Sequence, residues 1–433
     1  MSQITIGLIG IGVLFLLMFL RMPIGFAMVL VGFIGFIYLG SVEGALYVMG
    51  TETFSNISNY NLSVLPLFML MGQFAFYSGI SEKLFKTAHK WLGHLPGGLA
   101  MATIAGCAGF GAICGSGIAT AMTFGPVVLP EMKKYNYDPG LATGSVAAGG
   151  TLAILIPPSN LFIMYGILTQ LSIGKLFIAG VFPGILLASL CMATVYIQVK
   201  HNPNLALSTP ATTMREKLAS LRGISEMLAL FVLVMGGLYG GIFTANEAAG
   251  AGAAGALLIG LIRRRFTLQG FISALVETVK TTGMVFVIII GAMVFNRFLT
   301  LTGIPDALVK FAGGLPVPPL VIVAVLVVIY MILGALFDEL AITLLTVPIF
   351  FPVILSKGID PIWFGVVFCI LMEMGMILPP VGINVFIIAG VAKDVPMYTV
   401  YRGIGPFIIP MVITIGILMA FPQLALYLPN HMK

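Results

Sequence analysis

Charged residues are scarce in this chain. They make up 8% of its 433 residues, whereas hydrophobic residues make up 59%. A soluble domain of this length cannot bury so much apolar surface, and apolar runs long enough to cross a bilayer recur along the chain. The composition therefore predicts an all-α polytopic membrane protein. Because the apolar runs are continuous rather than alternating, they exclude a transmembrane barrel.

Cysteine and histidine are also rare, with four of each. The cysteines show no C-x-x-C spacing, so we interpret Cys107, Cys114, Cys191 and Cys369 as small buried hydrophobic residues. No Walker A, H-E-x-x-H or G-x-S-x-G motif occurs, which argues against ATP hydrolysis and against an enzyme. The net charge of +6 does not indicate a nucleic-acid partner, because basic residues in such a chain are better read as topology markers.

The apolar runs predict where the membrane helices lie. They cover residues 4–20, 24–40, 62–79, 176–199, 224–242, 246–262, 282–300 and 397–420, and three longer regions cover 97–133, 139–170 and 316–392. The first run lacks a basic flank before it and a small-residue cleavage site after it. We therefore expect a retained helix rather than a signal peptide.

Lysine and arginine positions predict the topology. The linker 201–222 is rich in basic residues and is placed in the cytoplasm. The residues that then share the cytoplasmic side are Arg21, Lys83, Lys86, Lys90, Lys133, Lys134, Lys200, Arg215, Lys217, Arg222, Arg263, Arg264, Arg265, Lys393 and Arg402, and those clearly outside are Lys175, Lys310, Lys357 and Lys433. This assignment requires 97–133 to leave and re-enter the cytoplasmic side, and 316–357 to leave and re-enter the opposite side.

An internal repeat relates the two halves of the chain. The segments "FGPVVLPEMKKYNYDPG" and "TVPIFFPVILSKGIDPI" align at a constant offset of 222 residues, the separation of Pro126 and Pro348. The same offset pairs Pro130 with Pro352, Asp138 with Asp360, Pro139 with Pro361, Pro157 with Pro379 and Pro158 with Pro380. Because the charge pattern places the halves in opposite orientations, we predict two inverted-topology repeats, as in secondary transporters.

The two Pro-Pro pairs predict broken helices. Pro157-Pro158 removes two N–H donors and forces the first proline out of helical geometry. The break would leave free carbonyls at 153–156 and free N–H groups near Ser159 and Asn160, and Pro379-Pro380 would do the same at 375–378 and 382–384. Carbonyls at a helix C-terminus suit Na⁺, and N–H groups at an N-terminus suit a carboxylate. A single pair could be a simple kink, but two equivalent pairs favour a site.

Each half also predicts a hairpin tip within the membrane. "GAICGSGIAT" places Gly115-Ser116-Gly117 at the first turn, although helix packing by glycine or an ordinary two-helix crossing are alternatives. "GALFDELAIT" places Asp338 and Glu339 at the second turn, and Asp338 aligns with Ser116. Intramembrane carboxylates usually mark a pathway or an ion.

Three further charged residues have competing interpretations. Glu373 is either functional or a structural hydrogen-bond acceptor. Arg297 near a helix end can snorkel to water, with a structural ion pair as the alternative. Glu247 follows Thr244 by three residues, which favours a capping box over a transport site.

Three long motifs resemble one family. "CGSGIATAMTFGPVVLPEMKKYNYDPGLATGSVAAGGTLAILIPPS", "GGLYGGIFTANEAAG" and "GMILPPVGINVFIIAGVAKD" are similar to the large membrane subunit of tripartite ATP-independent periplasmic (TRAP) transporters. The resemblance implies import of an organic acid, such as a C4-dicarboxylate or sialic acid, across the bacterial inner membrane. It implies coupling to two or more Na⁺ ions, no organic cofactor, a periplasmic binding protein and a separate small four-helix membrane subunit.

The resemblance also implies an elevator architecture. Its scaffold would comprise 1–96 and 223–315, each with an arm helix, and its moving transport domain 97–200 and 316–433, with the cytoplasmic linker 201–222 between the halves. The amphipathic segment 81–95 fits the first arm, or a connector lying on the membrane surface.

Carried over from the family, the sites fall at the breaks and tips. Sodium site 1 would use Ala112, Ser116, Ala153, Ile156 and Ser159, and sodium site 2 would use Gly334, Gly375, Leu378 and Val381, largely through carbonyls. Substrate would bind among Ser116, Ser159, Asn160, Asp338 and Asn384. Leu378 departs from the threonine that the family often carries there, so a hydroxyl ligand is missing from the second site.

Other classes of function remain as alternatives. A stand-alone Na⁺- or H⁺-coupled symporter would need no binding protein. A channel with re-entrant loops would use a continuous polar pore, whereas polar groups here concentrate at the breaks. A membrane enzyme is the weakest alternative, because no catalytic constellation occurs.

Overall fold

A computed structural model describes residues 2–264 and 266–432, so Arg265 and Lys433, two of the topology markers above, lie outside the described residues. Regular structure within those ranges is helical, without a strand. Seven of these helices are long and apolar enough to span a membrane, or up to nine if each of two bent pairs is one span. The prediction of an all-α membrane protein is confirmed.

The chain begins with helices that lie beside a long central helix, which is called the rod below. These are α1 (Gln3–Phe19), α2 (Ile24–Leu39), α3 (Val42–Ile57), the short 3-10 helix η1 (Tyr60–Ser63) and α4 (Val64–Tyr77). The helix α3 was not predicted, because polar residues such as Glu43, Glu52 and Asn56 interrupt its apolar pattern. Ser41 caps it by accepting a hydrogen bond from the Gly44 N–H.

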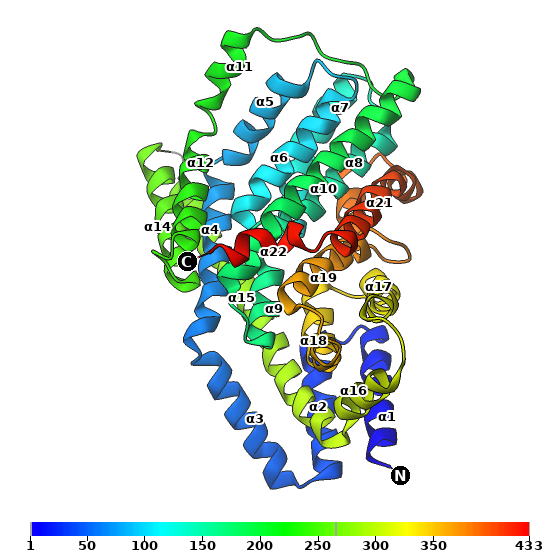
Figure 1. Cartoon of the computed structure of the whole chain (residues 1–433). Helices are drawn as coiled ribbons and strands as arrows, with labels where there is room; N and C mark the ends of the chain where they lie inside the picture. The colour runs from blue at the N-terminus through cyan, green and yellow to red at the C-terminus, as the bar shows by residue number, and fades with distance from the viewer. Residues whose placement is uncertain (1, 265, 433) are drawn as a thin grey trace.

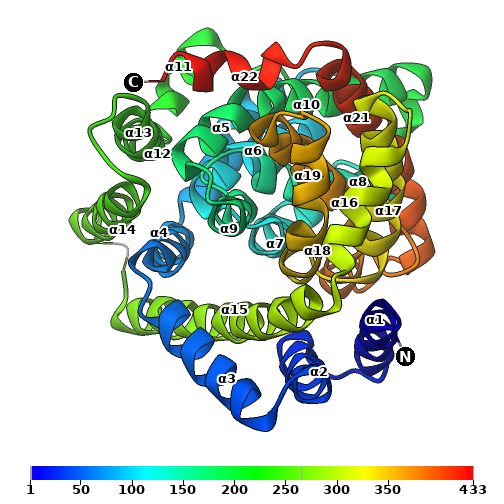
Figure 2. The same cartoon turned by 60° about the horizontal axis from the view of Figure 1, so that its bottom comes forward.

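The rod is α15 (Leu268–Thr302), which is longer than the predicted run 282–300 because Thr267 caps an additional polar stretch. It packs most extensively on α2, where glycines allow close contact: a Cβ added to Gly291 would lie 2.3 Å from the Gly25 carbonyl oxygen. Figure 2 shows α15 running between α1–α3 and the rest of the bundle.

The second group of flanking helices precedes this rod in the chain. It consists of α12 (Ser225–Phe231), a π-helical turn (Val232–Gly236), α13 (Gly237–Tyr239) and α14 (Ala245–Ile262). Glu247 forms the predicted capping box with Thr244 at the start of α14. Glu226 of α12 pairs with Arg263 at 2.7 Å and with Lys83 at 3.7 Å, which ties this group to the neighbouring helix α5 (Ile80–Leu92).

Two shorter helices precede the two hairpins, α5 (Ile80–Leu92) and α16 (Ile304–Gly314). The axis of α5 bends 66° from α4. Its predicted amphipathic character is confirmed, because Leu84 and Phe85 are buried while Glu82 and Lys86 are exposed.

Each half contains a hairpin followed by a broken helix. The first half has α6 (Gly98–Cys114), α7 (Gly117–Lys134), α8 (Pro139–Leu155), α9 (Asn160–Thr169) and α10 (Ile173–His201). The second has α17 (Pro319–Leu336), α18 (Glu339–Ser356), α19 (Pro361–Gly375), α20 (Ile383–Val391), α21 (Met397–Ala420) and α22 (Gln423–Asn430). The last of these was not predicted. Asp138 and Asp360 are N-caps followed by proline at the first helical position in their respective halves.

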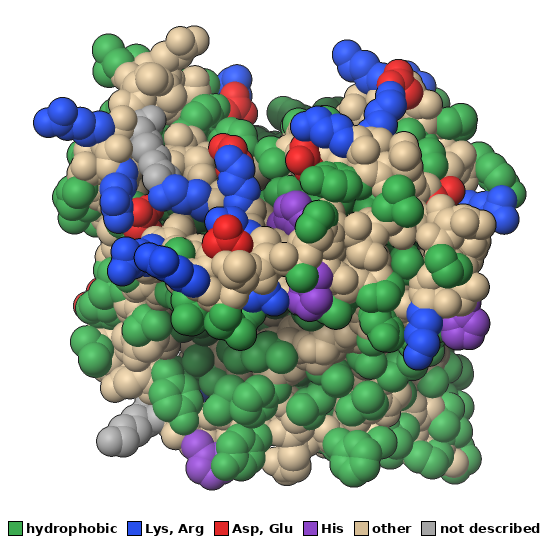
Figure 3. All heavy atoms as spheres, turned by 90° about the horizontal axis from the view of Figure 1, so that it is seen from above, with side chains coloured by type: hydrophobic (Ala, Val, Ile, Leu, Met, Phe, Trp, Pro, Cys, Tyr) green, Lys and Arg blue, Asp and Glu red, His purple; other side chains and the backbone are tan. Residues whose placement is uncertain are grey.

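The linker between the halves lies against α5. It contains a short 3-10 turn (Pro203–Leu205) and α11 (Met214–Leu221), which Figure 1 shows beside α5 at the top of the molecule. Trp91 Nε1 donates to the Lys217 carbonyl at 3.2 Å, and Thr212 Oγ1 donates to the Lys90 carbonyl at 2.6 Å. Figure 3 shows lysine and arginine side chains gathered over part of this upper face, beside a broad hydrophobic area.

Arg297 has an acidic partner in the structure. Its Nε donates to Glu52 Oε1 at 2.7 Å, joining α15 to α3, so the ion pair that the sequence analysis gave as the alternative forms. The four cysteines are buried and unbridged, as expected.

Candidate functional site

The tip of the first hairpin touches the break of the helix that follows it. Gly115 ends α6 with φ of +63°, and a Cβ there would lie 2.6 Å from the Pro158 carbonyl oxygen. The Asn160 N–H donates to the Gly115 carbonyl at 3.3 Å. This N–H was expected to be free, but the hairpin tip satisfies it. The tip and the break therefore form one unit.

Two helices begin at this junction. Ser116 caps α7 by accepting from the Ala119 N–H at 3.3 Å, and Ser159 caps α9 by accepting from the Phe162 N–H at 3.4 Å. Ser159 is fully buried and Asn160 nearly so. The positive ends of two helix dipoles thus lie close together, an arrangement that favours an anion.

The carbonyl groups of the junction lie where α6 crosses α8. A Cβ added to Gly111 would lie 2.4 Å from the Cα atom of Ala153, so the backbones touch beside Ala112. The side chain of Ile156 points elsewhere and packs on Gly184 of α10. Of the residues expected in sodium site 1, the structure gathers Ala112, Ser116, Ala153 and Ser159 around the tip and break, and Ile156 could contribute only its backbone.

The second half makes a similar contact, shifted by one residue on the hairpin helix from the offset of 222 residues. A Cβ added to Gly375, the counterpart of Ala153, would lie 2.4 Å from the Cα atom of Gly334. The Val381 N–H donates to the Ala335 carbonyl at 3.1 Å, and the Leu378 N–H donates to the Gly375 carbonyl at 3.2 Å. All four residues expected in sodium site 2, Gly334, Gly375, Leu378 and Val381, therefore lie at one junction. Each Pro-Pro bond, Pro157-Pro158 and Pro379-Pro380, is cis.

The sequence analysis missed a residue at this second junction. Tyr401 of α21 donates its hydroxyl to the Val381 carbonyl at 2.7 Å and to the Pro380 carbonyl at 3.2 Å. No motif pointed to it, since it lies 20 residues further along the chain. The Val381 carbonyl therefore already accepts a hydrogen bond, and it is not a free ligand for an ion.

Asp338 occupies the same structural position as Ser116. It caps α18, and its Oδ1 accepts from the N–H groups of Leu340 at 3.0 Å and Ala341 at 3.4 Å. Capping fixes the carboxylate at the hairpin tip. Asn384, at the start of α20, is fully buried, and its side-chain amide has no hydrogen-bond partner among the described residues.

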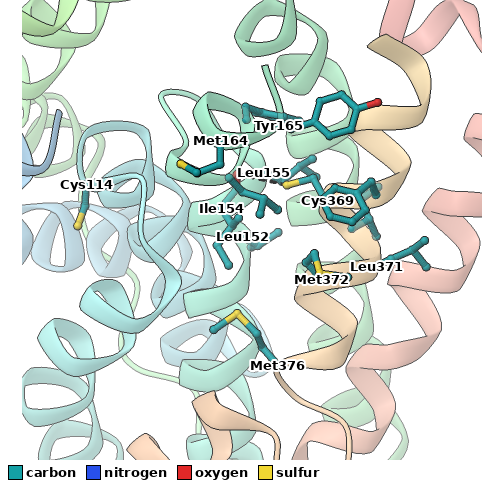
Figure 4. Close-up of a cluster of buried hydrophobic side chains, with 14 of the residues drawn as sticks. Cys114, Leu152, Ile154, Leu155, Met164, Tyr165, Cys369, Leu371, Met372 and Met376 are labelled. Carbon is teal, nitrogen blue, oxygen red and sulfur yellow. Dashed lines mark hydrogen bonds between the residues drawn. The ribbon is translucent and has the colours of Figure 1, made fainter. Parts of the chain in front are cut away.

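The carbonyl end of α8 faces α19. Cys369 Sγ donates to the Ile154 carbonyl at 3.4 Å, and Figure 4 shows Cys369 against Ile154 and Leu155. Carbonyls at the first break were expected to be free, but Ile154 has this thiol as a partner. The contact joins the first half to the second.

A large cavity lies away from these junctions. A volume of about 870 Å³ opens between the end of α7, the start of α8 and the end of α20, and Lys133, Asp138 and Asp394 are among its lining residues. None of the expected site residues lines it. The cavity is thus separate from the tip-and-break junctions.

Comparison with known proteins decides the family. The family described as tripartite ATP-independent periplasmic transporter, DctM component, matches residues 11–424. The chain belongs to this family.

Among relatives, the C4-dicarboxylate TRAP transporter large permease protein DctM of Pseudomonas aeruginosa is 35% identical over 385 residues, covering 88% of this chain and 89% of that one. The sialic acid TRAP transporter large permease protein SiaM of Vibrio cholerae is 32% identical over 415 residues, covering 96% of each chain. These matches make this DctM-family chain a multi-pass protein of the bacterial inner membrane, and its relatives are permeases rather than enzymes.

Solved structures extend the likeness of the fold. The Alcanivorax borkumensis YdaH transporter aligns with a TM-score of 0.65 at 15% sequence identity, covering 88% of this chain and 90% of that one. At this identity the likeness shows the fold alone, that of a membrane transporter.

Proposed function

We propose that this DctM-family chain imports an organic acid across the bacterial inner membrane, driven by a sodium gradient. The observation that supports this most is the paired junction: in each half a hairpin tip contacts the break of the following helix. The named relatives transport a C4-dicarboxylate or sialic acid, and both substrates carry carboxylates.

The junctions supply the chemistry that coupled transport needs. The N-termini of α7 and α9, capped by Ser116 and Ser159, would attract the carboxylate of the substrate. The carbonyls of the crossings at Ala153 and Gly375 would bind Na⁺ in sites 1 and 2. Substrate would lie among Ser116, Ser159, Asn160, Asp338 and Asn384. Cation and anion bound together offset each other's charge, which lowers the cost of burying either alone.

An elevator would move these sites across the membrane. We infer that 97–200 and 316–433 form the moving transport domain and that 1–96 and 223–315 form the scaffold, the two halves being inverted repeats. The rod α15 and the helices α5 and α16 support this assignment, because they lie between the outer helices and the hairpins. As in the family, a periplasmic binding protein would deliver substrate, and a small four-helix membrane subunit would accompany the chain.

The test is uptake into proteoliposomes that contain the chain with its small subunit and binding protein. Uptake should saturate with substrate and stop when the sodium gradient is removed. Ser116→Ala, Asp338→Asn and alanine at either proline pair should each lower uptake at least about tenfold, since each removes a feature of a junction. Ser189→Ala, on an exposed face of α10, is the matched control and should transport normally.

Three results would contradict the proposal. Flux that does not saturate would indicate a channel. Full uptake without the binding protein would indicate a stand-alone symporter. Normal uptake in all junction variants would remove the site assignment.

A further inference from the structure

The linker helix α11 has an apolar face that the rest of the described chain leaves uncovered. The side chains of Met214, Leu218 and Leu221 are 64%, 56% and 38% exposed. Because an α-helix makes 3.6 residues per turn, these three positions lie on one face of α11, which we call the apolar face. Apolar side chains gathered on one exposed face indicate a contact surface.

A different face of α11 is already occupied by α5. Trp91 Nε1 donates to the Lys217 carbonyl at 3.2 Å, and Thr87 Oγ1 donates to the Ser220 carbonyl at 3.1 Å. The Lys217 Nζ atom also lies 6.0 Å from the centre of the Trp91 ring. These contacts fix the rotation of α11 about its own axis, and they leave the apolar face turned away from α5.

Basic side chains border the apolar face on both sides. In helical geometry Arg215 and Arg222 lie along one edge of it and Lys217 along the other. Glu216, the only acidic residue of α11, belongs to the capping box, where its Oε2 accepts from the Thr213 N–H at 3.0 Å. Arg215 and Arg222 form no ion pair with any residue in the described ranges. Their positive charge is therefore available to an anionic partner.

The helix α11 lies where the chain enters the membrane. The segment after it, Ser225–Tyr239, is apolar, and its axis differs from that of α11 by 48°. Leu228 and Val232 of that segment are exposed, as expected of side chains that face lipid. Charged residues are costly in hydrocarbon, so the change from the charged α11 to this segment marks the membrane surface. Figure 1 shows α11 beside α5 and above α12.

We propose that α11 binds the surface of the bilayer, with its apolar face among the lipid chains and its basic residues on the phosphates of anionic phospholipids. An amphipathic helix whose apolar face is bordered by basic residues binds anionic membranes in this way. Long basic side chains reach the headgroups while their methylene groups cover apolar surface. Since α5 is hydrogen-bonded to α11, the same contact would hold α5 at the membrane surface. The proposal does not depend on the transported substrate or the coupling ion.

The test places a fluorescent label on either side of α11. The four native cysteines are buried, so bimane can be attached to Leu218→Cys on the apolar face and to Ala219→Cys, an exposed matched control that points away from it. The full chain is reconstituted in nanodiscs of phosphatidylcholine with or without phosphatidylglycerol. Spin-labelled lipid should quench the label at position 218 several-fold more strongly than the label at 219, and aqueous iodide should do the reverse.

The contact with anionic headgroups has its own variants. Phosphatidylglycerol should increase the lipid quenching at position 218, and Arg215→Gln combined with Arg222→Gln should abolish most of this increase. Lys175→Gln removes an exposed basic residue at the end of α10 remote from the linker. It is the matched control and should retain the increase.

Three results would overturn the proposal. Equal quenching by iodide at both positions would place the apolar face in water. Protection from iodide without quenching by lipid would mean that protein covers this face, such as a second copy of the chain. Lipid quenching that does not change with phosphatidylglycerol would exclude recognition of anionic headgroups. If Leu218→Cys does not fold, Met214→Cys tests the same face.

Discussion

Gly334 of α17 and Gly375 of α19 meet backbone against backbone, so that a Cβ added to Gly375 would lie 2.4 Å from the Cα atom of Gly334. In the first half a similar contact joins Gly111 to Ala153: a Cβ added to Gly111, which precedes the position equivalent to Gly334 by one residue, would lie 2.4 Å from the Cα atom of Ala153. In both halves the hairpin helix crosses the broken helix directly beside the break. This close approach places the backbone carbonyls of the two helices next to one another, where side chains would otherwise separate them.

The crossing should not tolerate a methyl group. Gly375→Ala forces the two helices apart and should cost about 1–3 kcal/mol of stability through overpacking, with loss of uptake because the junction opens. Gly283→Ala, on α15, meets no atom within 4 Å and is the control. Thermal unfolding in detergent and sodium-driven uptake measure the two effects. Unchanged uptake in Gly375→Ala would show that the crossing does not position the site.

Much of this arrangement could be predicted from the sequence because it depends on local chemistry. Prolines break helices wherever they occur, and Asp138-Pro139 and Asp360-Pro361 mark helix starts by capping and fixed φ. The structure confirms both breaks and both hairpin turns at the predicted residues.

Other features depended on contacts between residues distant in sequence. The pairing of Glu52 with Arg297, the hydrogen bonds of Tyr401 and the contact of Cys369 with the Ile154 carbonyl all join separate helices or distant segments. Local sequence patterns do not predict such contacts. The helix α3 was missed for a related reason: its polar residue Glu52 finds a partner across the fold, and an apolar pattern alone does not reveal that pair.

The hydroxyl group of Tyr401 should affect stability and sodium dependence at the second junction. Tyr401→Phe removes the hydrogen bond to the Val381 carbonyl and should cost about 1 kcal/mol of stability. If that carbonyl also binds Na⁺, the variant should shift the sodium concentration of half-maximal uptake. Tyr398→Phe lies on the same helix at a 77% exposed residue and is the matched control. Identical sodium dependence in both variants would exclude Val381 from the sodium site.

The ion pair between Arg297 and Glu52 should contribute modestly to stability. The arginine side chain is 62% exposed and the glutamate 12%, so water screens one partner only. A double-mutant cycle with Arg297→Gln and Glu52→Gln, followed by denaturant unfolding in detergent, should give a coupling of about 0.5–1 kcal/mol. The exposed pair Lys280 and Glu277 should give less. A larger coupling in that control pair would contradict the role of burial.

The linker should be protected while it lies against α5. Its exposed basic residues, Arg215 and Arg222, are sites for trypsin, and the bond from Trp91 to the Lys217 carbonyl holds α11 in place. Trp91→Phe removes that donor but keeps an aromatic ring, so cleavage should become several-fold faster as the linker detaches more often. Ser208→Ala, an exposed linker residue, should leave the rate unchanged. Because we predict that the linker lies in the cytoplasm, trypsin should cut it in inverted vesicles and spare it in right-side-out ones. Cleavage from the periplasmic face would contradict the predicted topology, on which the prediction of inverted repeats depends.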